Sequence, residues 1–329
     1  MGKFGYLLDK YIHLDKKDFN RIVKEIKLKT NMSKNKIIKD IINCHFAYKS
    51  SYRDYYDYEF YKLTPEEKRT YITTGINQDF INKNNKHVDY FTNRIKFYEK
   101  FHKYINREYI VINEDNYEEF KKFTKSHQNI VAKSIDFSNQ NLLGKVKLNN
   151  KNRESVFHEL LNNKLNVIEE DIIEYPELSK LHPKSLNTIR VITLNQKIIL
   201  AYLQIGVDDN ITDSFNENNL IAPVNIDTGL IDYSAVDKNK NTYDRHPNSK
   251  ENILWLTIPK WPRIKRFVEN LAKETPELKY VGWNVCLNEK DPVLVSATAT
   301  PRSDIYQLPE HNNTKTGYKE IFEKELEGD

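Results

Sequence analysis

Two runs rich in β-branched and other apolar residues follow one another in the second half of the chain, with only two residues between them. The runs span residues 188–194 and 197–207, and Asn195 and Gln196 connect them. A two-residue connection between such runs is typical of a β-hairpin, in which the two strands pair antiparallel. The sequence therefore predicts an antiparallel sheet here, and this excludes an all-helical fold.

Further apolar runs of strand length surround this hairpin. The turn residues 227–229 and 288–291 each separate two of these runs, which predicts two more hairpins. A helix is expected over residues 262–272, because its apolar residues lie at helical spacing. Strands mixed with helices in this order predict the α+β fold class. The additional expected strands are residues 129–134, 166–170, 220–224, 230–236, 280–286 and 293–296.

The first third of the chain carries helical signals instead. Apolar residues follow Asp18 at the spacing of one helix face, and a second such stripe follows Ser33. Residues 64–67 (Thr-Pro-Glu-Glu) have the pattern of a helix start, with a capping threonine, a proline in the first turn and a glutamate three residues after the cap. We therefore expect a helical N-terminal region over residues 1–85.

Composition excludes several classes of protein. The chain has 9 glycines in 329 residues and neither a G-x-G-x-x-G nor a Walker A motif, which disfavours a doubly wound dinucleotide-binding fold. No run approaches the ~20 apolar residues of a membrane span, and residues 1–6 lack the pattern of a signal peptide. The two cysteines, Cys44 and Cys286, have no metal-binding or redox spacing. We expect a cytoplasmic protein without a transmembrane segment, in which both cysteines are buried thiols.

The net charge of +4 is unevenly distributed along the chain. Residues 1–50 contain twelve Lys and Arg against five Asp and Glu, an excess of +7, so the rest of the chain sums to −3. A basic N-terminal segment is consistent with contact to anionic lipid or nucleic acid, and equally with a solvated helical face. We favour the solvated face and expect no nucleic-acid partner, because charge alone supplies no specificity.

Five short segments indicate a protein family. In order and spacing they resemble the sugar-transfer-associated ATP-grasp family, and the resemblance extends over roughly residues 50–320 of the chain. The segments are residues 52–55 (Tyr-Arg-Asp-Tyr), 182–193 (His-Pro-Lys-Ser-Leu-Asn-Thr-Ile-Arg-Val-Ile-Thr), 258–261 (Ile-Pro-Lys-Trp), 281–283 (Val-Gly-Trp) and 304–309 (Asp-Ile-Tyr-Gln-Leu-Pro).

The resemblance implies an ATP-grasp fold, in which two α+β subdomains enclose a nucleotide cleft after the helical region. The expected boundaries are residues 1–85 for the helical region, 86–172 for the first subdomain and 173–329 for the second. The family resembles ATP-dependent carboxylate–amine ligases, and its genes are associated with surface-polysaccharide synthesis. ATP is therefore the expected cofactor, and the expected substrate is a sugar- or glycan-linked small molecule.

The resemblance also implies two cationic contacts to the phosphates. Lys133 lies where the family places its phosphate-contacting lysine, and Arg94 lies at the approximate place of an earlier family lysine. Cationic side chains are needed there because they neutralise the phosphate charge. The alternatives are a lysine that extends to solvent for Lys133 and a helix-surface arginine for Arg94.

A second implied part of the nucleotide site is the hinge that contacts adenine through backbone groups. Glu169, Glu170, Asp171 and Ile172 align with this hinge. Contacts made by backbone groups do not depend on the side chains, so the segment is still expected to bind the adenine base.

The two expected catalytic residues come from the most specific segment. The resemblance implies that Arg190 faces the γ-phosphate or an acyl-phosphate, where a guanidinium stabilises developing charge. Asn187 is expected to orient that arginine. The alternatives are a structural salt bridge for Arg190 and a strand-capping turn for Asn187.

The metal and loop positions depart from the family pattern. The family has an Asp after Gly-Trp and then a Glu-x-Asn pattern, where this sequence has Asn284, Ser296 and Thr298. Because Mg²⁺ prefers anionic oxygen ligands, these replacements predict weakened metal binding. The expected glycine-rich flap after the Lys133 strand retains only Gly144, and Arg302 stands where a glycine is expected.

Other residues offer alternatives for a metal site. Asp227, Asp291 and Asp304 are acids near the replaced positions and could form a relocated site, although turn chemistry explains the first two. His182 and His246 each precede a proline, and we interpret them as hydrogen-bonded loop residues rather than ligands or bases.

Three functions therefore remain open. The first is an active ATP-dependent ligase or kinase that acts on a sugar-linked substrate. The second is an ATP-grasp protein that keeps a nucleotide or glycan site without Mg²⁺-dependent ligation. The third is an interaction module whose basic N-terminal helices dock on a membrane or on a glycosyltransferase.

Overall fold

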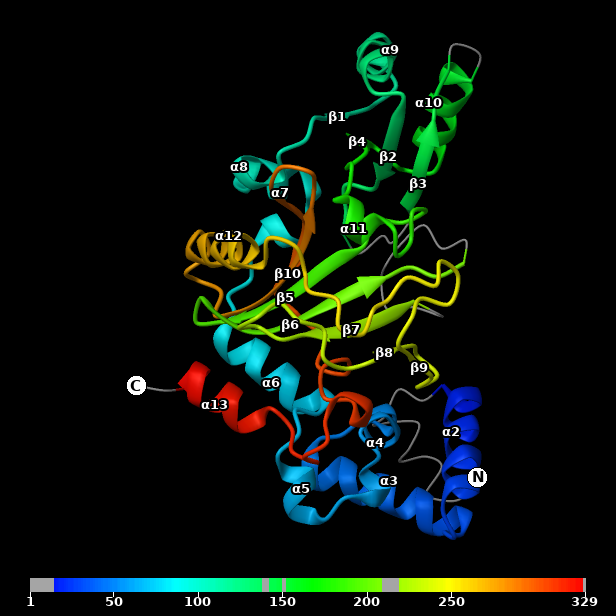
Figure 1. Ribbon diagram of the computed structural model, residues 1–329, viewed down its shortest axis with the longest axis vertical. Coiled ribbons are helices and arrows are strands. Elements are labelled where there is room, and N and C mark those ends of the chain that lie inside the picture. The colour runs from blue at the N-terminus through cyan, green and yellow to red at the C-terminus, as the bar shows by residue number, and fades with distance from the viewer. Residues whose placement is uncertain (1–14, 138–141, 150–151, 209–218, 328–329) are drawn as a thin grey trace. The chain divides into compact units, whose positions relative to one another are not determined.

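The structure is a computed structural model that describes residues 15–137, 142–149, 152–208 and 219–327 (Figure 1). Its contacts divide the chain into two units. The first contains Met1–Asn85 with Thr300–Asp329, and the second contains Lys86–Ala299. The subdomain boundaries expected within residues 86–329 stay a prediction.

The first unit is helical. Ser33 caps α3 by accepting from the Lys36 N–H, and Thr64 and Glu67 form the expected capping box at the start of α5. The helix expected after Asp18 begins earlier, at Lys16, because Asp15 supplies the cap. The helices of this unit are α2 (Lys16–Lys29), α3 (Lys34–Tyr48), α4 (Tyr52–Asp57), η1 (Phe60–Lys62), α5 (Pro65–Arg69), α6 (Thr74–Asn84), η3 (Pro309–His311) and α13 (Lys319–Glu327).

The core of this unit is formed by the predicted apolar stripes together with tyrosines. Phe19, Ile26 and Ile41 are buried in one cluster with Tyr55 and Tyr58. Burial of these rings explains the tyrosine-rich segment as core packing, since an aromatic side chain contributes a large buried area.

The second unit begins with short helices and a four-stranded antiparallel sheet, here called the small sheet (Figure 1). The strand order is β1-β4-β2-β3. Helices α9 and α10 pack on it through Phe120 and Phe157, which join Ile130 and Ile168 in one cluster. The elements are η2 (Asp89–Phe91), α7 (Arg94–Lys100), α8 (His102–Ile105), β1 (Tyr109–Val111), α9 (Tyr117–Ser126), β2 (Asn129–Lys133), β3 (Leu142–Lys147), α10 (Arg153–Asn162) and β4 (Val167–Glu170).

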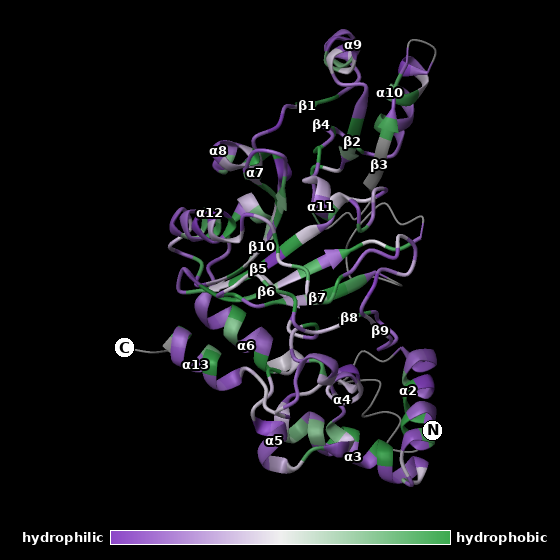
Figure 2. Cartoon of the chain, in the orientation of Figure 1, coloured by the Kyte–Doolittle hydropathy of each residue, from purple (hydrophilic) through white to green (hydrophobic). Residues whose placement is uncertain are grey.

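A second, seven-stranded antiparallel sheet, here called the large sheet, follows in the same unit. Its order is β11-β10-β5-β6-β7-β8-β9, and apolar residues colour much of β7 and β10 in Figure 2. Helix α12 buries Ile264 and Val268 in the same cluster as Val191 and Trp283 of the sheet. The elements are α11 (Pro176–Ser179), β5 (Thr188–Leu194), β6 (Lys197–Ile205), β7 (Leu220–Val224), β8 (Ala235–Val236), β9 (Thr242–Tyr243), α12 (Trp261–Lys273), β10 (Tyr280–Leu287) and β11 (Pro292–Thr298).

The α+β class and the central hairpin are confirmed. Asn195 and Gln196 connect β5 to β6 and both have positive φ, as a tight two-residue hairpin turn requires. The strand expected over residues 230–236 is mostly absent, since only its last two residues form β8. Its first residues bond to the segment near Leu256 instead, so the neighbouring loop takes the partners that a regular hairpin would use.

The structure also describes the surroundings of the two cysteines and the apolar content of the helices. Cys44 and Cys286 are both buried thiols that form no disulfide, as expected. Within the described ranges, no helix is both long enough and apolar enough to cross a membrane.

Candidate functional site

One buried carboxylate on β4 lies among cationic side chains from three other segments of the second unit. Glu169 lies on β4, the strand of the small sheet that pairs with both β1 and β2. Lys133 ends β2, Arg94 begins α7, and Arg107 follows α8. These residues, with Tyr98 of α7, are here called the Glu169 cluster.

The contacts within this cluster are direct. The Lys133 ammonium and the Arg107 Nε lie 2.9 and 2.6 Å from the Glu169 carboxylate, and Tyr98 donates to it. Only 2% of the Glu169 and Arg107 side chains is exposed. Arg94 donates to the Ser134 carbonyl at 2.9 Å and remains close enough for its charge to act on Glu169. Three cations therefore surround one carboxylate in a desolvated place.

Arg107 is the cation of this cluster that no sequence motif identified, and Tyr98 was not predicted either. Its Nη1 donates to the carbonyls of Ile105 and Leu294, whereas its buried Nη2 has no hydrogen-bond partner among the described residues. A buried guanidinium nitrogen without an acceptor is costly unless a ligand supplies one. No sequence motif surrounds Arg107. The one local feature beside it is Asn106, which ends α8 in a left-handed conformation.

Burial shifts the pKa values of the cluster. It raises the pKa of the Glu169 carboxyl to about 8, and the positive charge of Arg94 opposes this shift. It lowers the pKa of Arg94 and of Arg107. Each group is thus held where its charged form is poorly solvated, and an added anion would find cations that water does not screen.

The hinge residues lie at the end of β4. The backbone N–H groups of Glu170 and Asp171 donate to the carbonyls of Glu108 and Asn129, so they serve the small sheet. Ile172 is half-buried, and the adjacent Ile173 is 71% exposed. The adenine contact expected from residues 169–172 stays a prediction.

A second group of side chains crosses three strands of the large sheet. Arg190 on β5, Asn284 on β10 and Ser296 on β11 lie opposite one another in register. The Arg190 Nη1 donates to Asn284 Oδ1 at 2.9 Å, and Asn284 Nδ2 donates to Ser296 Oγ at 2.8 Å. These three residues are here called the strand network.

Gly282 makes room for this network. A Cβ at that position would lie 2.7 Å from Arg190 Nη2, so the guanidinium passes over the glycine. Thr298, the third replaced metal position, stands opposite Gly282 in the β10–β11 pair. The structure thus brings together all three replaced positions and Arg190.

Asn187 has other partners. It is fully buried, and its amide donates to Glu174 Oε2 and to the Leu178 carbonyl, each at 3.0 Å. These bonds tie the start of β5 to α11. Its expected role in orienting Arg190 stays a prediction.

The two groups meet along β11. Arg107 of the Glu169 cluster donates to the Leu294 carbonyl, and Ser296 of the strand network is two residues further on the same strand. Two residues of β-strand rise by about 7 Å. The cluster and the network are therefore close enough to contact different parts of one extended ligand.

The Glu169 cluster fits the polyphosphate of the cofactor that the resemblance implies. Three cations around one carboxyl group leave an excess of positive charge whether Glu169 is protonated or ionised, and Arg107 Nη2 can donate to a further acceptor. Phosphate oxygens supply both the negative charge and the acceptors. Arg94, Arg107 and Lys133 are the residues that would hold the phosphates.

The strand network does not fit Mg²⁺. Its donors are an amide and a hydroxyl, both neutral, and the amide oxygen already accepts from the Arg190 guanidinium. A divalent cation prefers anionic oxygens and would be repelled by that guanidinium. The described residues contain no group of three or more His, Cys, Asp and Glu side chains arranged to hold a metal.

The carboxylates of two alternative metal ligands are paired with arginines, and the third residue lies in a turn. Asp304 is paired with Arg302, and Asp291 with Arg263. The Asp227 N–H bonds to Asn225 Oδ1 in a turn. These contacts agree with turn and surface roles.

The two histidines are bonded within loops. His182 Nδ1 lies 2.7 Å from Ser185 Oγ, and His246 Nε2 lies 2.8 Å from the Gly206 carbonyl. Both rings are buried. These contacts support their interpretation as structural loop residues. Of the glycine-poor flap, residues 138–141 lie outside the described part, and Gly144 lies on β3.

Comparison with known proteins gives a family and several remote structural likenesses. The family model for sugar-transfer-associated ATP-grasp proteins matches residues 108–321. No curated protein matches the sequence significantly.

Solved ATP-grasp structures match the chain at low identity and low TM-score. D-alanine–D-alanine ligase from Bacillus anthracis is 10% identical, with 80% of this chain and 68% of that chain covered and a TM-score of 0.40. The ATP-grasp ligase PsnB, in complex with a minimal precursor, is 11% identical, with 72% and 55% covered and a TM-score of 0.36. The chain thus spans about half the length of the PsnB structure.

The assignment rests on the family model, which covers more than half of the chain and includes both sheets from β1 to β11. The resemblance noted in the sequence and the α+β architecture agree with it. The chain is a member of the sugar-transfer-associated ATP-grasp family.

Proposed function

We infer that this protein binds ATP through the Glu169 cluster and serves a surface-polysaccharide pathway without performing Mg²⁺-dependent ligation. The observation that carries the inference is the buried Arg107, whose Nη2 lacks a partner among the described residues while two further cations lie around the same carboxylate. Phosphate oxygens would complete this arrangement.

The nucleotide is held by side chains that differ in role. Arg94, Arg107 and Lys133 neutralise the phosphates, and the end of β4 with the exposed Ile173 offers an apolar surface for the base. Bound ATP would supply a transferable phosphoryl group. Arg190 would orient that end of the nucleotide from the large sheet.

Metal-dependent ligation is disfavoured by the replaced positions. Asn284 and Ser296 are neutral and bond to each other, so they offer Mg²⁺ no negative charge. We therefore propose that the protein keeps the nucleotide site of its family for binding a nucleotide or a sugar-linked ligand. A cytoplasmic location is part of this proposal, since ATP is available there.

An active ligase or kinase on a sugar-linked substrate is the second candidate. The observation that favours it is Arg190, held across Gly282 between β5 and β10 as a guanidinium that can face a transferring phosphoryl group. Other cations can neutralise phosphates in place of a metal.

Calorimetric titration with ATP, with Mg²⁺ and with EDTA, tests the proposal. We expect micromolar binding that does not need Mg²⁺ and that weakens about tenfold or more in Lys133→Ala, because a charge-assisted hydrogen bond is lost. Lys147→Ala is the matched control, since Lys147 is an exposed lysine of the same sheet.

The outcomes separate the candidates. Absent binding, or equal binding by the Lys133 and Lys147 variants, would contradict the nucleotide site. Binding that needs Mg²⁺, together with ADP release above an Arg190→Ala control, would favour the active enzyme instead.

A further inference from the structure

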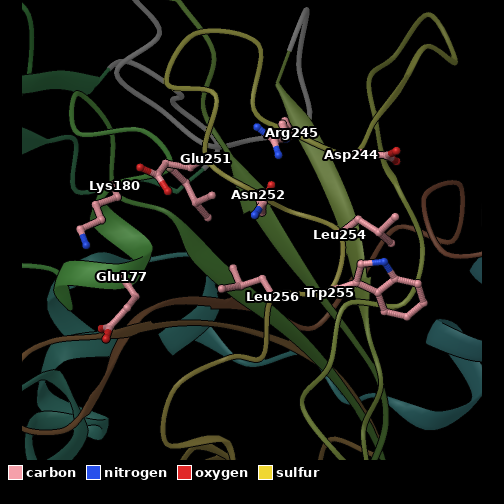
Figure 3. Close-up of a pocket in the computed structure, with 10 residues that line it drawn as sticks. Glu177, Lys180, Asp244, Arg245, Glu251, Asn252, Leu254, Trp255 and Leu256 are labelled. Carbon is pink, nitrogen blue, oxygen red and sulfur yellow. The ribbon is translucent and has the colours of Figure 1, made fainter.

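A pocket of about 520 Å³ lies in the second unit between α11 and the segment 244–256 (Figure 3). Its volume falls within the range of about 300–1,000 Å³ that is usual for small-ligand sites. Figure 3 shows Asn252 and Leu256 in the middle, with Lys180 and Glu177 to one side and Trp255 to the other. None of these residues belongs to the Glu169 cluster or the strand network.

Trp255 is the unusual residue of this pocket. It is 67% exposed, whereas the other two tryptophans, Trp261 and Trp283, are 2% and 0% exposed. Its φ is +69°, a left-handed backbone conformation that costs roughly 1–2 kcal/mol for a residue other than glycine. Exposure and strain both work against stability, and strained residues with this pattern concentrate at ligand sites.

The surrounding segment holds Trp255 in place. Its N–H donates to the Ile231 carbonyl at 2.8 Å, and the neighbouring Ile253 is fully buried. Ser249 Oγ donates to the Leu181 carbonyl at 2.9 Å, which ties the segment to the residues after α11. The indole is thus presented by a fixed backbone, so little ordering is needed when a ligand binds.

The polar side chains of the pocket are mixed in kind. In the part of the chain that the structure describes, Glu177, Lys180 and Arg245 form no ion pair, and the carboxylate of Glu251 likewise has no cationic partner. With Asp244, three carboxylates stand against two cations, so the pocket carries no excess of positive charge. This disfavours a phosphate-rich ligand. Donors and acceptors around one aromatic face instead suit a neutral ring that bears many hydroxyl groups.

We propose that this pocket binds a mono- or disaccharide unit that stacks on Trp255. The apolar C–H face of a sugar ring covers the indole, and the hydroxyl groups exchange hydrogen bonds with Glu177, Lys180, Arg245, Glu251 and Asn252. The site goes beyond the proposed nucleotide function, and it supplies the place where a sugar-linked ligand is recognised.

Tryptophan fluorescence tests the proposal directly. Because the other two tryptophans are buried, acrylamide quenches mainly Trp255 in the intact protein. Glucose, galactose, N-acetylglucosamine, glucuronic acid and maltose are titrated separately into the intact protein. We expect at least one of them to protect Trp255 from quenching, with a Kd of about 1 mM or below.

Two variants and a control keep the test decisive. Trp255→Gly removes the indole and relieves the left-handed strain, so the variant is expected to fold and to lose saccharide binding by about tenfold or more in saturation-transfer NMR. Asn252→Ala is expected to weaken binding several-fold. Phe46→Ala removes an exposed aromatic of the first unit and is expected to leave binding unchanged.

The proposal is overturned if none of the sugars protects Trp255 from quenching. It is also overturned if Trp255→Gly and the intact protein give equal NMR signals. Calorimetry with ATP on Trp255→Gly separates the two sites. If Trp255→Gly binds ATP as the intact protein does but no longer binds the saccharide, the pocket is supported independently of the nucleotide site. If the intact protein does not bind ATP at all, only the nucleotide proposal is contradicted.

Discussion

The Glu169 cluster and the strand network lie about two strand residues apart on β11, yet they differ in burial and charge. The cluster holds three cations around one carboxyl group, and its Glu169 and Arg107 are almost entirely buried. The network has one cation, Arg190, and two neutral partners, all half-buried. One region therefore keeps costly buried charge, and the other lacks anionic groups.

This difference indicates which part of a nucleotide site persists in this chain. Buried charges are expensive and are retained where they pair or bind a ligand. Neutral groups beside an arginine can receive an anion but not a divalent cation. The contrast supports phosphate binding at the cluster and argues against a metal at the network.

The largest expected effect is on the cluster. Glu169→Ala should lower the free energy of unfolding by roughly 3–5 kcal/mol at pH 9, because Lys133 and Arg107 lose the carboxylate that compensates them. Glu170→Ala is the matched control on the same strand, and its half-exposed side chain should cost less than about 1 kcal/mol. If the two variants lose the same free energy in urea unfolding, the buried carboxylate of Glu169 contributes no more to stability than the partly exposed Glu170. The contrast in burial would then have no energetic consequence.

The second test gives the network the charges that it lacks. The triple change Asn284→Asp, Ser296→Glu and Thr298→Asn installs the family pattern and should make ATP binding at least about tenfold tighter with Mg²⁺ than with EDTA. Calorimetry with each additive measures this. If the unmodified protein already shows this dependence on Mg²⁺, the contrast between cluster and network breaks down.

A third test uses the pKa of Glu169. As the pH rises from 7 to 9 through the raised pKa of about 8, the carboxyl loses its proton and the positive excess of the cluster falls by one charge. ATP affinity should weaken roughly three- to tenfold over this interval. Glu169→Gln has no such proton, so its pH profile reports the other groups that titrate in this interval, among them ATP and Arg107, whose pKa burial lowers to about 9. An identical pH profile in the intact protein and in that variant would count against the assignment.

The smallest expected effect is on the network. In Gly282→Ala the new methyl meets the flexible end of Arg190, which can move, so the free energy of unfolding should change by less than about 1 kcal/mol. Gly206→Ala is the contrasting control, because its methyl would meet the buried Ser185 and His182 side chains. A larger loss for Gly282→Ala than for Gly206→Ala would show that the network is as rigid as the cluster.

Much of the fold could be predicted from local sequence. The hairpin at Asn195 and Gln196, the capped start of α3 at Ser33 and the stripe of α12 each depend on residues a few positions apart. The family could be predicted from short segments such as residues 187–190. In these cases neighbouring residues fix the backbone or carry the pattern.

The expected strand over residues 230–236 shows the limit of this reasoning. Its composition is that of a strand, but Ile231 bonds with Leu256 and Trp255, more than twenty residues away. Local propensity was overridden by partners that the pattern does not identify.

The site residues also fall into two groups, those predicted from the sequence and those that only the structure revealed. The sequence by itself pointed to Lys133, Arg190 and the replaced metal positions, because each occupies a place in a recognisable segment. Only the tertiary structure placed the buried Arg107 beside Glu169 and an exposed Trp255 beside α11. Burial and charge pairing are set by residues far apart in the chain, so they are decided when the sheets and helices pack and not before.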